Sequence, residues 1–322
     1  MIFVLVCLLG LRVPELVYGK FGSKQGTSGT AAIAALSDQT EVLFIGPSHI
    51  ECGIRPERYS MNVMNLTCPG QNYSCAERLV KKHIERVPNL KVAVIEFEEV
   101  PLIANTLASM HKDYRLLLEL GLSPHELPTN NILIKLKAAC YPILNLPRVT
   151  PVQWLKRRTD DASAQRSRNF AAGYYQAEVV MPPDYNPHPR FDKFLKLARN
   201  QAMIDQNLRA LLAMIDLLRG RGITVVLLRL PHHALYRENT PALLHSQVDR
   251  MKRSIAGRYA ADKQVVFWDL GNAAGFEDRR FYVDPEHLNV FGANKLAQVL
   301  NSKLRVLCNQ ANNETHRIRQ SA

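Results

Sequence analysis

Short apolar runs alternate with longer stretches of helical periodicity along most of this chain, and this alternation constrains the fold most strongly. The short runs are rich in Val, Ile and Leu, as strands buried in a parallel sheet are. Strands that alternate with helices predict a parallel sheet of about five strands with helices on both faces, a three-layer α/β/α fold. The expected strands are residues 41–46, 59–66, 91–97, 222–228 and 264–269, and the expected helices are residues 74–86, 191–219, 241–259 and 290–306.

The chain begins with an apolar run of signal-peptide length, residues 2–11, which stops at Arg12. Such a run is too short to span a bilayer comfortably. We expect residues 1–19 to be a signal peptide or a short membrane anchor, and a buried first strand or helix is the alternative.

The remaining sequence divides into a linker, one domain and a tail. Residues 20–40 are rich in Gly, Ser, Thr and Ala, which is typical of a linker. We predict a single domain over residues 41–308 and a flexible tail over residues 309–322. Scattered Pro and basic clusters interrupt the pattern between residues 101 and 190, a segment too long for a plain loop, so we expect a partly helical insertion there.

The chain is basic, with 41 Lys and Arg against 29 Asp and Glu and a formal net charge of +12. Such a surface attracts anionic polymers, anionic lipid head groups or an acidic substrate. The sequence has no zinc-finger spacing, no RNP-like aromatic stretch and no recognition-helix signature, so we expect no nucleic-acid partner.

Six cysteines are present, and none forms a CxxC motif or a Cys/His cluster with metal-ligand spacing. We therefore expect no metal and no cofactor. Cys52, Cys68 and Cys75 lie close together in the sequence. They either pair in an oxidising compartment or remain small buried thiols.

Ser48 follows the first predicted strand in the sequence Gly46-Pro47-Ser48-His49. Ligands of an open parallel sheet bind beyond the carboxyl ends of its strands. Gly46 permits a sharp turn there, and backbone N–H groups at the start of a following helical turn can stabilise an oxyanion. Ser48 is thus a candidate nucleophile, and a serine that caps a helix is the alternative.

A second loop follows the second predicted strand. Gly70 can bring its backbone N–H close to a ligand, and Gln71 or Asn72 can add a side-chain donor. The alternative is a Pro-Gly turn followed by an Asn that caps a helix.

Asp284 and His287 lie three residues apart in a Pro-containing loop between the last predicted strand and the last predicted helix. A carboxylate at this spacing can orient the imidazole, whose other nitrogen then takes a proton from a serine. The pKa of an unperturbed histidine lies near neutrality, as a general base requires. We predict that Ser48, His287 and Asp284 meet at one edge of the sheet.

Other polar residues near the strand ends have two interpretations each. His49 contacts substrate or is an ordinary polar loop residue, and His232 and His233 line the cleft or its rim. A metal at these two histidines is disfavoured, because adjacent side chains point in different directions and no carboxylate is suitably spaced. Glu96, Glu98 and Glu99 touch a ligand or cap the following helix.

These blocks, in this order, resemble the SGNH (GDSL-like) hydrolase superfamily over residues 41–306. Gly46-Pro47-Ser48-His49 resembles the first block, with Pro47 in place of Asp, Gly70 falls where the second block has its oxyanion glycine, and Asp284-Pro285-Glu286-His287 resembles the last block. The segment 228–233 also resembles a loop of cell-envelope members akin to DltD and the alginate O-acetylation proteins. The resemblance implies a flavodoxin-like α/β fold.

The third block departs from the superfamily pattern, because Glu98-Glu99-Val100 stands where Gly-x-Asn-Asp is usual. The oxyanion hole then lacks its Asn or takes Asn72 or Gln71 instead. Low hydrolytic activity, or an activity suited to transfer, would fit this loss.

The resemblance implies an exported esterase or O-acyltransferase of the periplasm or cell envelope, with the N-terminus as a possible membrane attachment. Its substrate would be an acylated surface polysaccharide, with acetyl as the expected group, or another ester. Ser48 would form an acyl-enzyme that is released to water or to a sugar hydroxyl. Two alternatives remain: a non-catalytic envelope protein that binds glycan in the same cleft, and a lipid-directed esterase.

Overall fold

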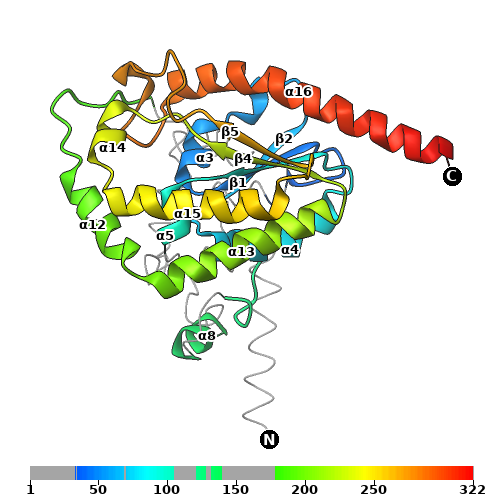
Figure 1. The fold of residues 1–322 in the computed structure, drawn as a ribbon, viewed down its shortest axis with the longest axis horizontal. Helices are drawn as coiled ribbons and strands as arrows, with labels where there is room; N and C mark the ends of the chain where they lie inside the picture. Colours follow the sequence, from blue (N-terminus) through cyan, green and yellow to red (C-terminus); the bar gives the residue numbers. More distant parts are fainter. Residues whose placement is uncertain are drawn as a thin grey trace, which may run out of the picture.

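Five parallel strands form the single sheet of the part of the chain that the structure describes (Figure 1). The structure is a computed structural model, and it describes residues 33, 35–68, 70–104, 121–127, 132–139 and 178–321. The spatial order is β2-β1-β3-β4-β5, and every neighbouring pair is parallel. The predicted α/β fold is confirmed. The strands are β1 Val42–Gly46, β2 Val63–Thr67, β3 Val92–Glu96, β4 Thr224–Arg229 and β5 Val265–Asp269.

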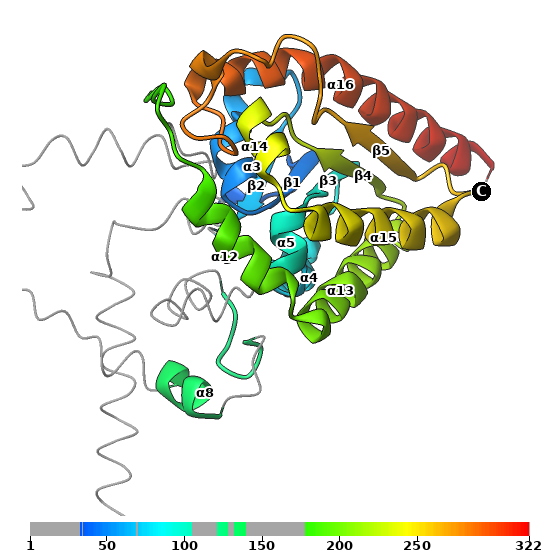
Figure 2. The same ribbon diagram turned by 60° about the vertical axis from the view of Figure 1, so that its left-hand side comes forward.

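Helices cover both faces of the sheet, as Figures 1 and 2 show. Alternate residues of β1 point to opposite faces, so Leu43 and Ile45 join one apolar core while Val42 and Phe44 join the other. The first core packs against α4 (Tyr73–His83), α13 (Gln201–Arg219) and α15 (Ala242–Tyr259), and the second against α3 (Ser48–Gly53) and α16 (Val290–Ser321).

One predicted helix, residues 191–219, is in fact two helices. α12 spans His188–Ala198, and α13 begins at Gln201. Asn200 caps the second helix, since its side chain accepts a hydrogen bond from the backbone N–H of Met203 at 3.2 Å. The apolar periodicity continues across this break, whereas the Asn cap determines where the second helix begins.

The other boundaries differ modestly from the prediction. The second strand starts only at Val63, because residues 59–61, which follow the 3-10 turn Pro56–Arg58, form bends. The end of the helix predicted over residues 74–86 is a 3-10 turn, Ile84–Arg86. Short elements that the periodicity did not indicate are α14 (Ala234–Asn239) and the 3-10 turn Arg279–Phe281. Within the predicted insertion the structure describes α5 (Glu99–Ile103) and α8 (Ile132–Ala139), and much of the remainder lies outside the described residues.

The last helix is longer than predicted. α16 runs to Ser321, so the residues expected to form a flexible tail continue the helix and extend beyond the sheet (Figure 1). No Gly or Pro follows Gly292 in the sequence, so no helix-ending residue interrupts the segment.

The predicted signal peptide or anchor, residues 1–19, lies outside the described residues, as does most of the predicted linker. Among the helices that are described, none combines the length and the apolar character that crossing a membrane requires.

The contrast between the two sides of α16 predicts how this helix contributes to stability. Leu300 is fully buried in the second core, whereas Val306 is 54% exposed. Leu300→Ala should lower the free energy of unfolding by about 2–5 kcal/mol, because it opens a cavity, and Val306→Ala should change it by less than about 0.5 kcal/mol. Urea unfolding of both variants measures the difference, and equal losses would contradict this packing.

Candidate active site

Ser48 is the first residue of α3 and lies just beyond the carboxyl end of β1. Gly46 makes this position possible by leaving space rather than by an unusual turn, since its φ is not positive. A Cβ on Gly46 would lie 2.6 Å from Ile50 Cγ1 and 2.9 Å from Glu96 Oε2. Pro47, not Ser48, occupies the N-cap position, so the serine hydroxyl is not used as a cap.

Ser48, His287 and Asp284 form one continuous hydrogen-bonded chain. Ser48 Oγ lies 2.8 Å from His287 Nε2. On the other side of the ring, His287 Nδ1 lies 2.9 Å from both Asp284 Oδ1 and Asp284 Oδ2. The structure therefore brings together the three residues that the sequence analysis selected, although 239 positions separate Ser48 from His287. An imidazole between a hydroxyl and a carboxylate is the arrangement that activates a serine.

The carboxylate of Asp284 accepts hydrogen bonds from the backbone of the loop that contains it. Asp284 Oδ1 accepts hydrogen bonds from the backbone N–H groups of Glu286 and His287, both at 2.9 Å. Burial opposes ionisation of Asp284, but the hydrogen bond and charge of His287, together with Arg190, outweigh it and hold the pKa of Asp284 well below its usual range. The carboxylate is therefore ionised at neutral pH, as the orienting member of such a chain should be.

A second set of hydrogen-bonded side chains, centred on His49, lies beside the set of Ser48, His287 and Asp284. His49 is buried, with Nδ1 2.8 Å from Glu96 Oε1 and Nε2 3.1 Å from Glu286 Oε2. Glu286 also accepts a hydrogen bond at 2.8 Å from Nη2 of Arg190, which comes from α12. Burial alone would lower the pKa of His49, but the charges of Glu96 and Glu286 raise it to about 10. His49 is thus a buried imidazolium whose two nitrogens both face protein carboxylates.

The sequence analysis gave no role to Glu286 or Arg190. Glu286 lies between Asp284 and His287, so its place in the loop could have drawn attention to it. Arg190 sits at the end of the insertion, about a hundred residues away in the chain, and no local pattern indicates its partner.

The acidic residues at the end of β3 form a buried cluster. Glu98 Oε1 accepts a hydrogen bond from the backbone N–H of Leu230 at 3.0 Å, and Tyr236 donates to Glu99 Oε2 at 3.3 Å. The guanidinium of Arg229 lies 3.6 Å from Glu98 and 3.5 Å from Glu99. Burial, with the charge of Glu99, raises the pKa of Glu98 well above its usual value. Although Glu98 sits at the N-cap of α5, its side chain makes no capping hydrogen bond.

His232 is buried beside this cluster rather than on a cleft rim. Its ring stacks on Tyr236 at a centroid distance of 4.3 Å and lies 5.8 Å from the ring of His49. Burial and the charge of His49 lower the pKa of His232 well below its usual value, so the ring is neutral. Its Nε2 has no hydrogen-bond partner among the described residues.

The loop after β2 uses its side-chain amides for structure. Asn72 caps α4 by accepting from the backbone N–H of Cys75 at 2.9 Å, and its amide donates to the carbonyl of Ala104 at 3.0 Å. In the orientation that satisfies its hydrogen bonds, the amide nitrogen of Gln71 faces the carbonyls of Leu66, at 3.3 Å, and Gly46. The predicted role of these two amides as oxyanion donors is therefore not supported, and the alternative of an Asn cap is confirmed. Gly70 has a φ of 66°, which glycine adopts readily.

Cys52, Cys68 and Cys75 are buried free thiols. A hydrogen bond between Cys68 and Cys75, together with burial, raises the pKa of Cys68 well above its usual value. Within the described residues, His, Cys, Asp and Glu side chains form no cluster suited to a metal ion.

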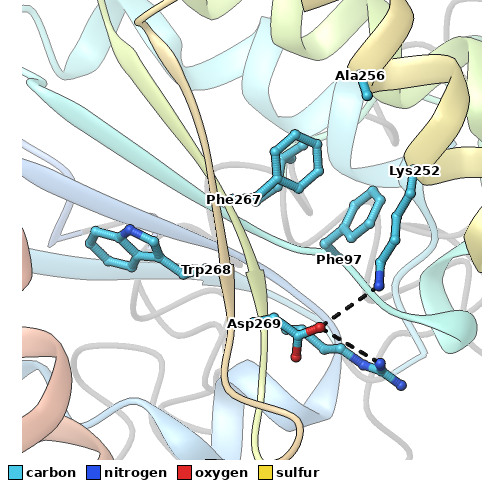
Figure 3. A pocket seen from close by; sticks show the side chains of 8 residues that line it. Phe97, Lys252, Ala256, Phe267, Trp268 and Asp269 are labelled. Atoms are coloured by element: carbon cyan, nitrogen blue, oxygen red, sulfur yellow. Dashed lines mark ion pairs between the residues drawn. The ribbon is translucent and has the colours of Figure 1, made fainter. Parts of the chain in front are cut away.

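A separate pocket of about 320 Å³ lies between β5 and α15, and Figure 3 shows it. Phe97 and Phe267 meet edge to face within it, with ring centroids 5.6 Å apart, while Lys252 and Asp269 stand at its polar end. None of the residues that line this pocket belongs to the hydrogen-bonded set of Ser48, His287 and Asp284.

Comparisons with known proteins give distant matches. In sequence, no protein family and no curated protein matches this chain. A protein from Bacteroides fragilis NCTC 9343 described as a putative acylhydrolase has a TM-score of 0.42 and 10% identity, and the match covers 86% of this chain and 93% of that one. A protein described as a putative platelet activating factor from Streptococcus pneumonia has a TM-score of 0.40 and 13% identity, with 94% and 98% covered. The fold assignment rests on the parallel sheet itself.

The charge on His49 predicts how stability depends on pH. Its pKa is about 10 in the folded protein and 6.5 when unperturbed, so its stabilising contribution is complete below the lower value and is lost as pH rises through the higher one. From about pH 7 to about pH 8.5, the free energy of unfolding should fall by about 1.4 kcal/mol per pH unit. Urea unfolding measures this slope, which should vanish in His49→Gln and persist in His125→Gln, a change at an exposed histidine. A slope that survives His49→Gln would contradict the assignment.

Proposed function

We propose that this chain is a serine ester hydrolase or O-acyltransferase of the SGNH type, with Ser48 as nucleophile, His287 as general base and Asp284 as the residue that orients the imidazole. The observation that carries the proposal is the contact of 2.8 Å between Ser48 Oγ and His287 Nε2, made while the opposite ring nitrogen faces the carboxylate of Asp284. A serine used only for structure has no need of an oriented imidazole.

The reaction proceeds in two steps. Ser48 Oγ attacks the carbonyl carbon of the ester while His287 Nε2 takes its proton, and the tetrahedral intermediate expels the alcohol, which receives that proton. Water or a sugar hydroxyl then attacks the carbonyl carbon of the acyl-enzyme while His287 takes a proton from it. The bond between Ser48 Oγ and the acyl group breaks, and His287 returns the proton to Ser48 Oγ. The backbone N–H of Ser48, at the start of α3, is a donor suited to the oxyanion, because the first N–H groups of a helix have no partner within it.

For the substrate we propose O-acyl groups, chiefly acetyl, on a polysaccharide of the cell surface. The formal charge of +12 supports an anionic polymer as partner. The apolar run at residues 2–11 supports export to the periplasm or cell envelope, with or without membrane attachment through the N-terminus. The resemblance of residues 228–233 to a loop of envelope members of the superfamily supports both.

Removing the nucleophile tests the chemistry. Ser48→Ala should reduce hydrolysis of p-nitrophenyl acetate by at least about a thousandfold and abolish labelling by a fluorophosphonate probe. Ser302→Ala, a change at an exposed serine of α16, is the matched control and should behave like the wild type. A folded wild-type protein that neither hydrolyses the ester nor reacts with the probe would refute the proposal and favour the non-catalytic, glycan-binding alternative.

Substrate class can be tested by comparing esters. We expect release of acetate from an O-acetylated anionic polysaccharide, with a KM that rises with ionic strength because salt screens the attraction between polymer and protein. The KM for the neutral p-nitrophenyl acetate should not respond to salt. Turnover of long-chain esters without acetyl turnover would instead identify a lipid-directed esterase.

A further inference from the structure

His49 lies directly beside the proposed catalytic chain without belonging to it. Its ring centroid is 4.7 Å from that of His287, with an angle of 59° between the planes. Both of its nitrogens face carboxylates, Glu96 at 2.8 Å and Glu286 at 3.1 Å, and the side chains of all three residues are at most 1% exposed. A charged group buried this deeply is costly unless it is well paired, so these contacts hold one another in place.

Glu286 links His49 to the loop that carries the catalytic imidazole. It lies between Asp284 and His287 in the chain, and its backbone N–H donates to Asp284 Oδ1 at 2.9 Å. Its carboxylate contacts His49 on one side and Arg190 of α12 on the other. One carboxylate therefore ties the loop both to the helical turn that carries the nucleophile and to a helix from a distant part of the chain.

We propose that His49 is a positioning residue: a buried imidazolium that draws Glu286, and with it the loop from Asp284 to His287, against the turn that presents Ser48. This inference rests on the proposed function, since it assigns a second set of residues to the same reaction. His49 acts through Glu286 and does not exchange a proton with the substrate.

The charges around His49 come from several elements and balance in pairs. The two carboxylates, Glu96 and Glu286, face the two cations, His49 and Arg190. The titratable and charged side chains about His49 are Glu96 of β3, Glu286 and His287 of the loop before α16, and His232 after β4, with Asp284 and Arg190 beyond them.

The first test is His49→Gln, measured with p-nitrophenyl acetate and with the rate of fluorophosphonate labelling. Misplacement of His287 should lower kcat by about tenfold to a hundredfold, because small displacements of a reacting group have effects of this size. KM should change little, since His49 faces protein carboxylates on both sides. A histidine with a purely structural role would alter the melting temperature and leave kcat of the folded fraction unchanged.

The second test is Glu286→Gln, which preserves shape and removes the charge. It should also lower kcat, and the acidic limb of the pH profile of kcat/KM should move to lower pH, because a negative charge next to His287 is gone. Should His49→Gln fail to fold, this variant decides the question. Unchanged kcat and an unchanged acidic limb in Glu286→Gln would overturn the proposal.

The double variant His49→Gln/Glu286→Gln tests whether the two residues act through one contact. Its loss of kcat should be no greater than that of the worse single variant, because either change already breaks the contact. As a control, Glu57→Gln, at a carboxylate that is 54% exposed, should leave the His49→Gln defect unchanged. Losses that multiply in the double variant would overturn the proposal.

Failure of this inference is distinguishable from failure of the proposed function. If Ser48→Ala removes activity while His49→Gln keeps the kcat and pH profile of the wild type, the triad stands and the role of His49 is refuted. If the wild type neither turns over the ester nor reacts with the probe, the proposed function fails first.

Discussion

Burial of charge at the carboxyl ends of the central strands is the constraint on which this site depends. Glu96, Glu98 and Glu99 follow one another at the end of β3, and each is at most 1% exposed. A buried carboxylate needs a partner, and none of the three finds it within its own strand. The partners come from the turn after β1, from the end of β4 and from α14. Segments far apart in the sequence must therefore converge at this edge for the fold to be stable.

The register of the sheet determines which residues can meet there. β1 and β3 pair so that Ile45 lies beside Ile95, which brings Gly46 next to Glu96. The carboxylate of Glu96 occupies the space that a Cβ on Gly46 would fill, and from there it reaches His49. Ser48, just after β1, and Glu96, at the end of β3, are thus placed by adjacent strands, while the loop before α16 supplies the remaining contacts.

The sequence predicts the layered fold and the hydroxyl–imidazole–carboxylate arrangement well, because both depend on the order and spacing of residues along the chain. Alternating periodicities indicate the strands and helices, and ligand-binding positions follow from strand ends. The break at Asn200 and the continuation of α16 past Cys308 were missed, since apolar periodicity does not report where capping begins or ends a helix. The sequence left open, for a related reason, whether Gln71 and Asn72 serve an oxyanion or the local turn. An amide's hydrogen-bond partners depend on the local turn, and Asn72 was needed at the start of α4.

The ion pair between His49 and the two glutamates could not be read from the sequence, since 47 and 237 positions separate its partners. The importance of this ion pair follows from the negative charge that develops in the proposed reaction. In the proposed reaction, attack by Ser48 places negative charge on a carbonyl oxygen close to several carboxylates, and in a low-dielectric interior unpaired carboxylates would oppose that charge. His49 and Arg190 offset Glu96 and Glu286, and burial raises the pKa of Glu98 well above its usual value, which favours its neutral form. Asp284 is offset by the imidazolium that forms on His287 as the attack proceeds. An interior rich in acids can therefore support an oxyanion where cations or protons offset those acids.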